Sequence, residues 1–117
     1  MRQADYDELR AFGLSHPEAV EEFPWGHSAL KVRGKTFVFL NLDDAELSMS
    51  VKLPVSRDFA LIFDFAEPTG YGLGRSGWIT ARFRSGEEPD MDLLRPWIRE
   101  SYKAIAPKKL AATLGED

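Results

Sequence analysis

A glycine-rich stretch is the first feature of the sequence that could bind a cofactor. Residues 72–77 read Gly-Leu-Gly-Arg-Ser-Gly, which is the G-x-G-x-x-G spacing of a dinucleotide-binding loop. Such a loop binds a pyrophosphate because it leaves a strand and enters a helix, whose N-terminus faces the phosphates. Here the glycines follow a predicted helix and Pro68, and they lead into a predicted strand. The sequence therefore predicts a connecting loop without a cofactor, although Arg75 at its tip could contact a phosphate.

The histidines and acidic residues do not form a catalytic or metal-binding motif. His16 and His27 are the two histidines, they lack H-x-x-x-H spacing, and the chain contains no cysteine. Disulfides and thiolate metal ligands are therefore excluded, and two histidines alone make a poor transition-metal site. No nucleophile motif accompanies His27. We predict that the protein is not an enzyme and holds no metal, with a small-molecule or metal site near Trp25 and His27 as a minor alternative.

Composition and charge are those of an ordinary globular domain. With 117 residues, 44% hydrophobic and 29% charged, the chain is predicted to form a single domain over residues 1–117. It shows neither a signal-peptide core nor an apolar run long enough to span a membrane, which predicts a cytoplasmic protein. The net charge of −4 argues against a strongly basic nucleic-acid binder, but residues 31–117 hold 13 basic and 13 acidic groups. A local basic face is therefore still compatible with the sequence.

Hydrophobic periodicity predicts the elements that must position any site. Helices are predicted over residues 5–12, 15–23 and 56–64 and from Asp92 onward; strands are predicted over 28–32, 35–40, 46–53 and 78–83. The second helix is inferred from the capping-box pattern Ser-His-Pro-Glu. In the third, the expected buried stripe is Val55, Phe59, Ile62 and Phe63. The economical packing is an α+β two-layer sandwich, in which helices cover one face of a mainly antiparallel sheet.

The side-chain register of the second predicted strand depends on the turn before it. A two-residue turn at Arg33-Gly34 would pair Val32 with Lys35, so that Phe37 and Phe39 face the core and Val38 and Leu40 face outward. A three-residue turn would reverse this arrangement. Either alternative leaves apolar groups on the outer face, which favours partial cover by a protein partner or by a second copy of the chain.

The remaining outer face is predicted to be polar and positively charged. Alternation places these side chains on it: Lys31, Ser48, Ser50, Lys52, Trp78, Thr80, Arg82 and Arg84, with Arg33 at the hairpin tip. Basic groups can contact phosphates, and an aromatic ring can stack on a base. A solvated polar face without any ligand is the alternative interpretation.

Several separate stretches, taken in order, resemble the MmcQ/YjbR family of small bacterial proteins from about Phe12 to Leu114. They are Leu-Ser-His-Pro-Glu at 14–18 with Glu-Glu at 21–22 and Pro-Trp-Gly-His at 24–27, Lys-Val-Arg-Gly-Lys-Thr-Phe at 31–37, the strand 47–52 that ends in lysine, Pro68 followed by Gly-Trp at 77–78, and Ser-Tyr at 101–102 with Ile105. Each motif is weak alone, and their order and spacing make the resemblance specific.

The resemblance implies a CyaY-like fold and DNA binding through a "double wing" of hairpins. Carried over to this chain, it points to Lys31, Arg33, Lys35 and Lys52, to which the alternation adds Trp78, Arg82 and Arg84. We expect weak, salt-sensitive binding of DNA by these residues. The alternative is a protein-interaction or self-association module, motivated by Trp78 beside Val38 or Leu40. A distant possibility, suggested by frataxin-type CyaY proteins, is iron binding by Asp5, Asp7, Glu8, Glu18, Glu21 and Glu22.

Overall fold

The computed structural model describes residues 2–70 and 72–114, and its centre is one antiparallel sheet. The strand order is β1-β2-β3-β4-β6-β5. The strands are β1 (Val20–Glu22), β2 (Ser28–Val32), β3 (Lys35–Asp43), β4 (Glu46–Lys52), β5 (Ala66–Pro68) and β6 (Trp78–Phe83). The helices are α1 (Arg2–Leu14), α2 (Arg57–Ala60), α3 (Met91–Ile105) and α4 (Lys108–Ala112), with 3-10 turns η1 (Pro24–Gly26) and η2 (Leu73–Ser76).

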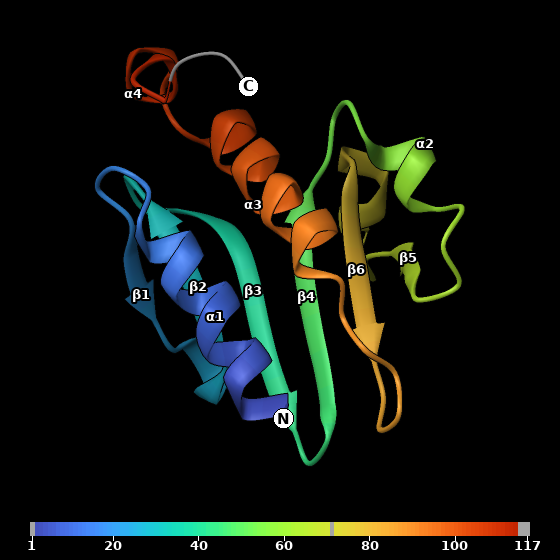
Figure 1. The fold of residues 1–117 in the computed structure, drawn as a ribbon. Coiled ribbons are helices and arrows are strands. Elements are labelled where there is room, and N and C mark those ends of the chain that lie inside the picture. The colour runs from blue at the N-terminus through green and yellow to red at the C-terminus, as the bar shows by residue number, and fades with distance from the viewer. Residues whose placement is uncertain (1, 71, 115–117) are drawn as a thin grey trace.

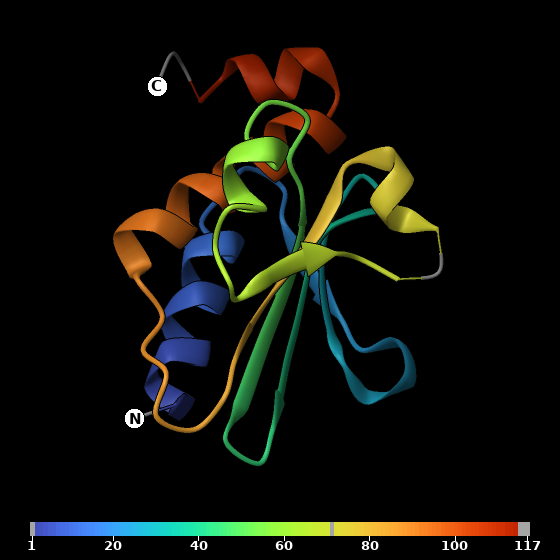
Figure 2. The same cartoon turned by 90° about the vertical axis from the view of Figure 1, so that its right-hand side faces the viewer.

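Helices α1 and α3 cover one face of the sheet, which we call the inner face (Figure 1). In the view of Figure 2 they lie on one side of the strands, whereas η2 lies on the other. Helix α3 begins at an Asp90 cap that accepts the Asp92 amide at 3.0 Å, and it buries Leu94, Ile98 and Tyr102 at helical spacing. The predicted α+β fold, with helices packed on one face of an antiparallel sheet, is confirmed.

The β2–β3 hairpin closes with the predicted two-residue turn. Arg33 and Gly34 have φ values of 51° and 81°, as a type I′ turn requires, and Val32 pairs with Lys35. The turn therefore has the shorter of the two lengths that the sequence allowed.

A β-bulge then changes the side-chain register of β3. Leu30 pairs with Val38, whereas the next residue of β2, Lys31, pairs with Thr36, so Phe37 is the extra residue. As a result Phe37 and Val38 are both fully buried, and Phe39 faces the outer side of the sheet, opposite Ser50. Neither predicted register holds along the whole strand, because the bulge reverses the alternation halfway.

The helix predicted over residues 15–23 is wrong: this segment forms a turn and the edge strand β1. The ring Nδ1 of His16 lies 3.0 Å from the carbonyl of Phe12 and 3.1 Å from that of Gly13, and the imidazole thus closes the end of α1. Glu18 adopts a left-handed φ of 61°, after which Val20 pairs with Lys31. The capping-box pattern at residues 15–18 therefore ends one helix and does not begin another.

The helix predicted over residues 56–64 is also shorter than expected, and of its predicted buried stripe Phe63 alone packs against the core. Only Arg57–Ala60 is helical, and the side chains of Val55, Phe59 and Ile62 are 85%, 53% and 75% exposed. The Oε2 atom of Glu100 in α3 accepts hydrogen bonds from the amides of residues 55 and 56, which fixes the start of α2. After Leu61 the chain turns into the edge strand β5, which the sequence did not indicate.

Candidate nucleic-acid interface

The seven predicted nucleic-acid contacts lie in two places. Lys31, Lys52, Trp78 and Arg82 lie on the outer face of the sheet, as the alternation predicts, and Arg84 follows directly after β6. Arg33 lies at the hairpin tip, as predicted, and Lys35 follows the turn; both line a groove together with the end of α3 and the start of α4. The predicted single basic face is therefore divided into two groups of cations.

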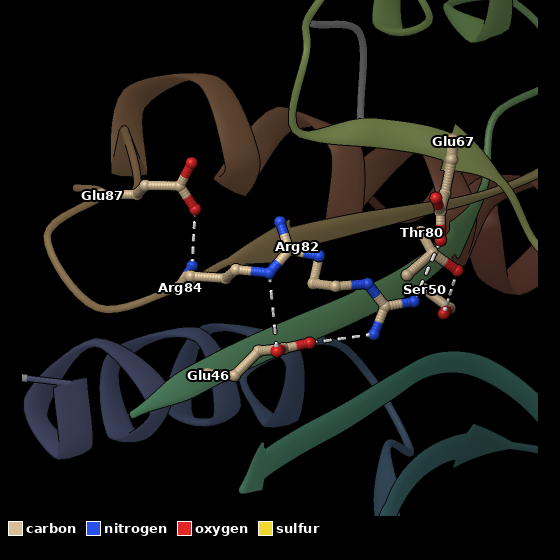
Figure 3. Close-up of polar contacts among 7 residues, drawn as sticks. All are labelled: Glu46, Ser50, Glu67, Thr80, Arg82, Arg84 and Glu87. Atoms are coloured by element: carbon tan, nitrogen blue, oxygen red, sulfur yellow. Dashed lines mark hydrogen bonds and ion pairs between the residues drawn. The ribbon is translucent and has the colours of Figure 1, made fainter. Parts of the chain in front are cut away.

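On the outer face, glutamates form ion pairs with both arginines. Arg82 donates from Nη1 to Glu46 at 3.1 Å and from Nη2 to Glu67 at 3.0 Å (Figure 3). The hydrogen bond to Glu67, with a further one to Glu46, raises the pKa of Arg82. Arg84 Nε lies 3.9 Å from the second oxygen of Glu46, and the amide of Arg84 donates to Glu87 at 2.6 Å. These contacts largely neutralise the positive charge at this end of β6.

The other cations of the outer face differ from one another. Lys31 pairs with Glu22 of the neighbouring edge strand at 3.0 Å. Among residues 2–70 and 72–114, the ammonium of Lys52 has no ion-pair partner. Of the charged groups predicted on this face, Lys52 therefore presents the least compensated positive charge.

Trp78 lies on the outer face but contributes little accessible surface. Its side chain is 7% exposed, and its ring centroid lies 5.6 Å from that of Phe39. A base has little indole surface on which to stack. Val38 and Leu40 are buried in the core, so the apolar outer patch that motivated self-association is not present at these residues.

A second basic region, which we call the end groove, lies between the hairpin tip and the junction of α3 with α4. A groove of about 520 Å³ is lined by four cations, and an adjoining hollow of about 480 Å³ adds a fifth. The cations of the end groove are Arg33, Lys35, Lys103, Lys108 and Lys109. Pro107 lines both hollows, so the two form one continuous surface.

The charges of the end groove are only partly compensated. Arg33 donates to both oxygens of Glu18, at 2.5 and 3.0 Å, and this pairing lowers the pKa of Glu18. Because both side chains are about half exposed, the pair contributes little to stability. Among the residues that the structure describes, Lys35, Lys108 and Lys109 have no ion-pair partner. Three ammonium groups thus remain available to an anionic ligand.

A buried aromatic cluster fixes the geometry beneath the end groove. The Tyr102 ring lies 4.9 Å from that of His16 and 5.2 Å from that of Phe37, and its hydroxyl donates to the carbonyl of Pro17 at 2.7 Å. Burial lowers the pKa of His16 and raises the pKa of Tyr102. Both shifts favour the neutral form of the side chain.

The break between α3 and α4 brings two lysines to the hairpin. Ala106 is extended, with φ −69° and ψ 153°, as expected for a residue before proline, and Pro107 precedes α4. Lys108 and Lys109 were not among the site residues predicted from the sequence. The sequence shows that they are neighbours after Pro107, but their closeness to Lys35 depends on tertiary packing.

Four of the six acidic residues considered for iron binding form ion pairs: Glu8, Glu18, Glu21 and Glu22. Glu21 accepts hydrogen bonds from Arg10 at 2.7 Å and from Ser28 at 2.6 Å, and the contact with Arg10 is the main reason that the pKa of Glu21 is lowered. Glu8 pairs with Arg95 of α3. In the described part of the chain, no group of three or more His, Asp or Glu side chains could hold a metal ion.

The glycine stretch forms a connection into a strand, as the sequence predicted. Gly72 and Gly77 adopt positive φ values of 81° and 89° on either side of η2, and Gly77 directly precedes Trp78 of β6. The buried Gly74 approaches the backbone closely, since an added Cβ would lie 3.0 Å from the carbonyl oxygen of Thr69. These requirements account for the glycines without a nucleotide.

Fold and surface together define a small α+β protein with an open antiparallel sheet and a basic groove at one end of it. The family model described as YjbR matches residues 14–104, and the chain belongs to the YjbR family. None of the curated proteins matches the chain. Within residues 2–70 and 72–114, none of the helices has the length and apolar character needed to cross a membrane.

Proposed function

We propose that this YjbR protein is a cytoplasmic, non-enzymatic protein that binds the phosphate backbone of DNA weakly, through the end groove. The observation that supports the proposal is the convergence of five cations from two distant parts of the sequence around one groove. Lysine ammonium groups act as point charges for phosphate and carry little sequence information. The expected binding is therefore insensitive to base sequence.

The expected affinity is low because the protein as a whole is acidic. The net charge of −4 opposes long-range attraction of DNA, and only the local groove favours it. If the three lysines without ion-pair partners each neutralise one phosphate, the logarithm of the binding constant should fall with the logarithm of salt concentration with a slope of about −3. The binding would then be nearly lost at high salt.

Fluorescence anisotropy tests the proposal directly, with labelled single-stranded and double-stranded DNA of unrelated sequences. We expect weak binding at low salt, similar affinities among sequences, and a loss of binding as salt is added. The variant Lys35→Gln/Lys108→Gln/Lys109→Gln is expected to bind at least about tenfold more weakly at low salt. No anisotropy change at low salt, or unchanged binding by the variant, would contradict the proposal.

A second candidate function, self-association or binding of a protein partner, is supported by a different surface. Val55, Phe59 and Ile62 form an exposed apolar patch around α2, in which two of the three residues are more than 70% exposed. Sedimentation over a range of protein concentrations tests self-association. Phe59→Ser should shift the protein toward the monomer and lower its melting temperature only slightly, since the residue is 53% exposed and its ring contacts Phe63.

A further inference from the structure

A second, chemically different hollow lies in the middle of the outer face. It has a volume of about 380 Å³, within the range of small-molecule sites. Side chains of the central strands β3, β4 and β6 form its floor, and the segments before β2 and after β5 form its rims. The lining residues that carry the argument are His27, Phe39, Asn41, Ser48, Ser50 and Thr80. We call this hollow the hydroxyl groove.

A chain of hydroxyl groups runs across the floor of the hydroxyl groove. Thr80 Oγ1 lies 2.8 Å from Ser50 Oγ and 2.9 Å from Thr69 Oγ1 (the first of these contacts is drawn in Figure 3). Three hydroxyls supply three protons, and the two contacts between them use two. One hydroxyl proton and several oxygen lone pairs therefore remain for a partner outside the chain.

Next to this chain lie two further polar side chains, those of Asn41 and Ser48. In the part of the chain that the structure describes, neither the Asn41 carboxamide nor the Ser48 hydroxyl forms a side-chain hydrogen bond. Asn41 and Ser48 are directly opposite each other in the β3–β4 ladder, so their side chains project from the same face. An amide and a hydroxyl offer donors and acceptors together, which suits a ligand with both.

The charge of the groove argues against an ionic ligand. Its arginine, Arg82, is held by Glu46 and Glu67, and the positive charge of Arg84 balances the second carboxylate. The ring of Phe39, half-buried beside the hydroxyl chain, adds an apolar surface. Hydroxyls, an amide and an aromatic ring without net charge match a sugar ring, which presents hydroxyl groups at its edge and C–H groups on its faces.

We propose that the hydroxyl groove binds a neutral sugar ring, either a free monosaccharide or the ribose of a nucleoside. The Asn41 amide and the Ser48 hydroxyl bond the ring hydroxyls, the Ser50–Thr80–Thr69 chain supplies further bonds, and Phe39 packs against the ring. The network of Arg82 with Glu46 and Glu67 keeps one wall of the groove rigid. This site is separate from the end groove and does not depend on DNA binding.

Titration of the ¹⁵N-labelled full chain, followed by amide chemical shifts, tests the proposal. The probes are ribose, glucose, adenosine and free adenine, with ribose 5-phosphate to detect an anion site. We expect millimolar binding of sugars or of adenosine, with shift changes concentrated at residues 39–41, 48–50 and 80. Response to monosaccharides identifies a free sugar as the ligand, and response to adenosine alone identifies a nucleoside.

Two variants and a matched control separate the groove from the rest of the surface. Asn41→Ala/Ser48→Ala should weaken binding by about two- to tenfold for each hydrogen bond lost, whereas Ser85→Ala, an exposed loop serine, should leave it unchanged. Phe39→Leu keeps apolar volume and should also weaken binding, which provides a second test if the double variant folds poorly. The proposal is overturned if no probe shifts these amides, if adenine binds as well as adenosine, or if ribose 5-phosphate binds more tightly than ribose.

Discussion

On the outer face of the sheet Arg82 contacts Glu46 and Glu67, and Lys31 contacts Glu22; in the end groove Lys35, Lys108 and Lys109 lack such partners within the described residues. The two regions have similar numbers of cations in the sequence but differ in the charge that they present. The difference arises from cross-strand pairing, because β-sheet register brings acids and bases of neighbouring strands together. Lys35 lies opposite Val32 at the end of the β2–β3 ladder, and Lys108 and Lys109 lie on α4, outside the sheet.

The comparison predicts that outer-face cations stabilise the fold. Arg82→Ala should lower the free energy of unfolding by about 1 kcal/mol, since it removes the ion pair of Glu67 and leaves Glu46 with the more distant Arg84 alone. Denaturant unfolding measures the loss. Adding Glu46→Gln and Glu67→Gln to Arg82→Ala should restore part of it, and an equal loss in the triple variant would show that the ion pairs are not its cause.

The next effect is a dependence of the free energy of unfolding on pH, caused by the buried His16. Burial lowers the pKa of His16 in the folded state, so the unfolded state binds its proton more readily. The free energy of unfolding should therefore fall as the pH drops below about 6.5, and this decline should flatten below the folded-state pKa. Thermal unfolding between pH 7 and 5 measures it. In His16→Gln the decline over this range should be reduced, and an unchanged pH profile would assign it to other groups.

A smaller effect is expected from the ion pair between Arg33 and Glu18 at the end groove. Glu18→Gln removes the carboxylate that holds Arg33 and should strengthen DNA binding about two- to threefold at low salt, by adding one phosphate contact. Glu22→Gln on the outer face has the same charge change and is the matched control. Equal gains from both variants would indicate a general charge effect without a localised site.

The smallest effect is expected on stability from the end-groove lysines themselves. Lys35→Gln, Lys108→Gln and Lys109→Gln should each change the free energy of unfolding by less than about 0.5 kcal/mol, because their side chains are exposed and unpaired. Denaturant unfolding of the single variants measures this. A substantial loss in any of them would show that the lysine has a structural role and would weaken the contrast between the two regions.

Much of the fold could be predicted from the sequence because its longest elements have clear periodicity. The strand over residues 78–83 and the core-facing positions of β4 match the structure, as does the Arg33-Gly34 turn. The edge strands β1 and β5 were not predicted, because three residues are too short to show a period. The bulge at Phe37 was not predicted either, since it depends on packing of that ring against Tyr102.

The candidate site was predicted less completely, for a related reason. Alternation correctly placed Lys31, Lys52 and Arg82 on one face, but sequence alone does not show which acids lie across from them. Helical spacing predicted that Val55, Phe59 and Ile62 are buried. In the structure α2 ends at Ala60, and all three residues are exposed. Contacts between distant segments, such as Lys35 with the α3–α4 junction, follow only from the assembled fold.

The most direct test compares the salt dependence of DNA binding for two variants that lose the same charge. One replaces Lys35, Lys108 and Lys109 by glutamine, and the other replaces Lys31, Lys52 and Arg84, so that each carries a net charge of −7, three below the −4 of the chain. We predict that the first variant loses a salt slope of about 3, whereas the second keeps a slope close to that of the unmodified chain. Equal slopes, or the larger loss in the outer-face variant, would contradict the assignment of binding to the end groove.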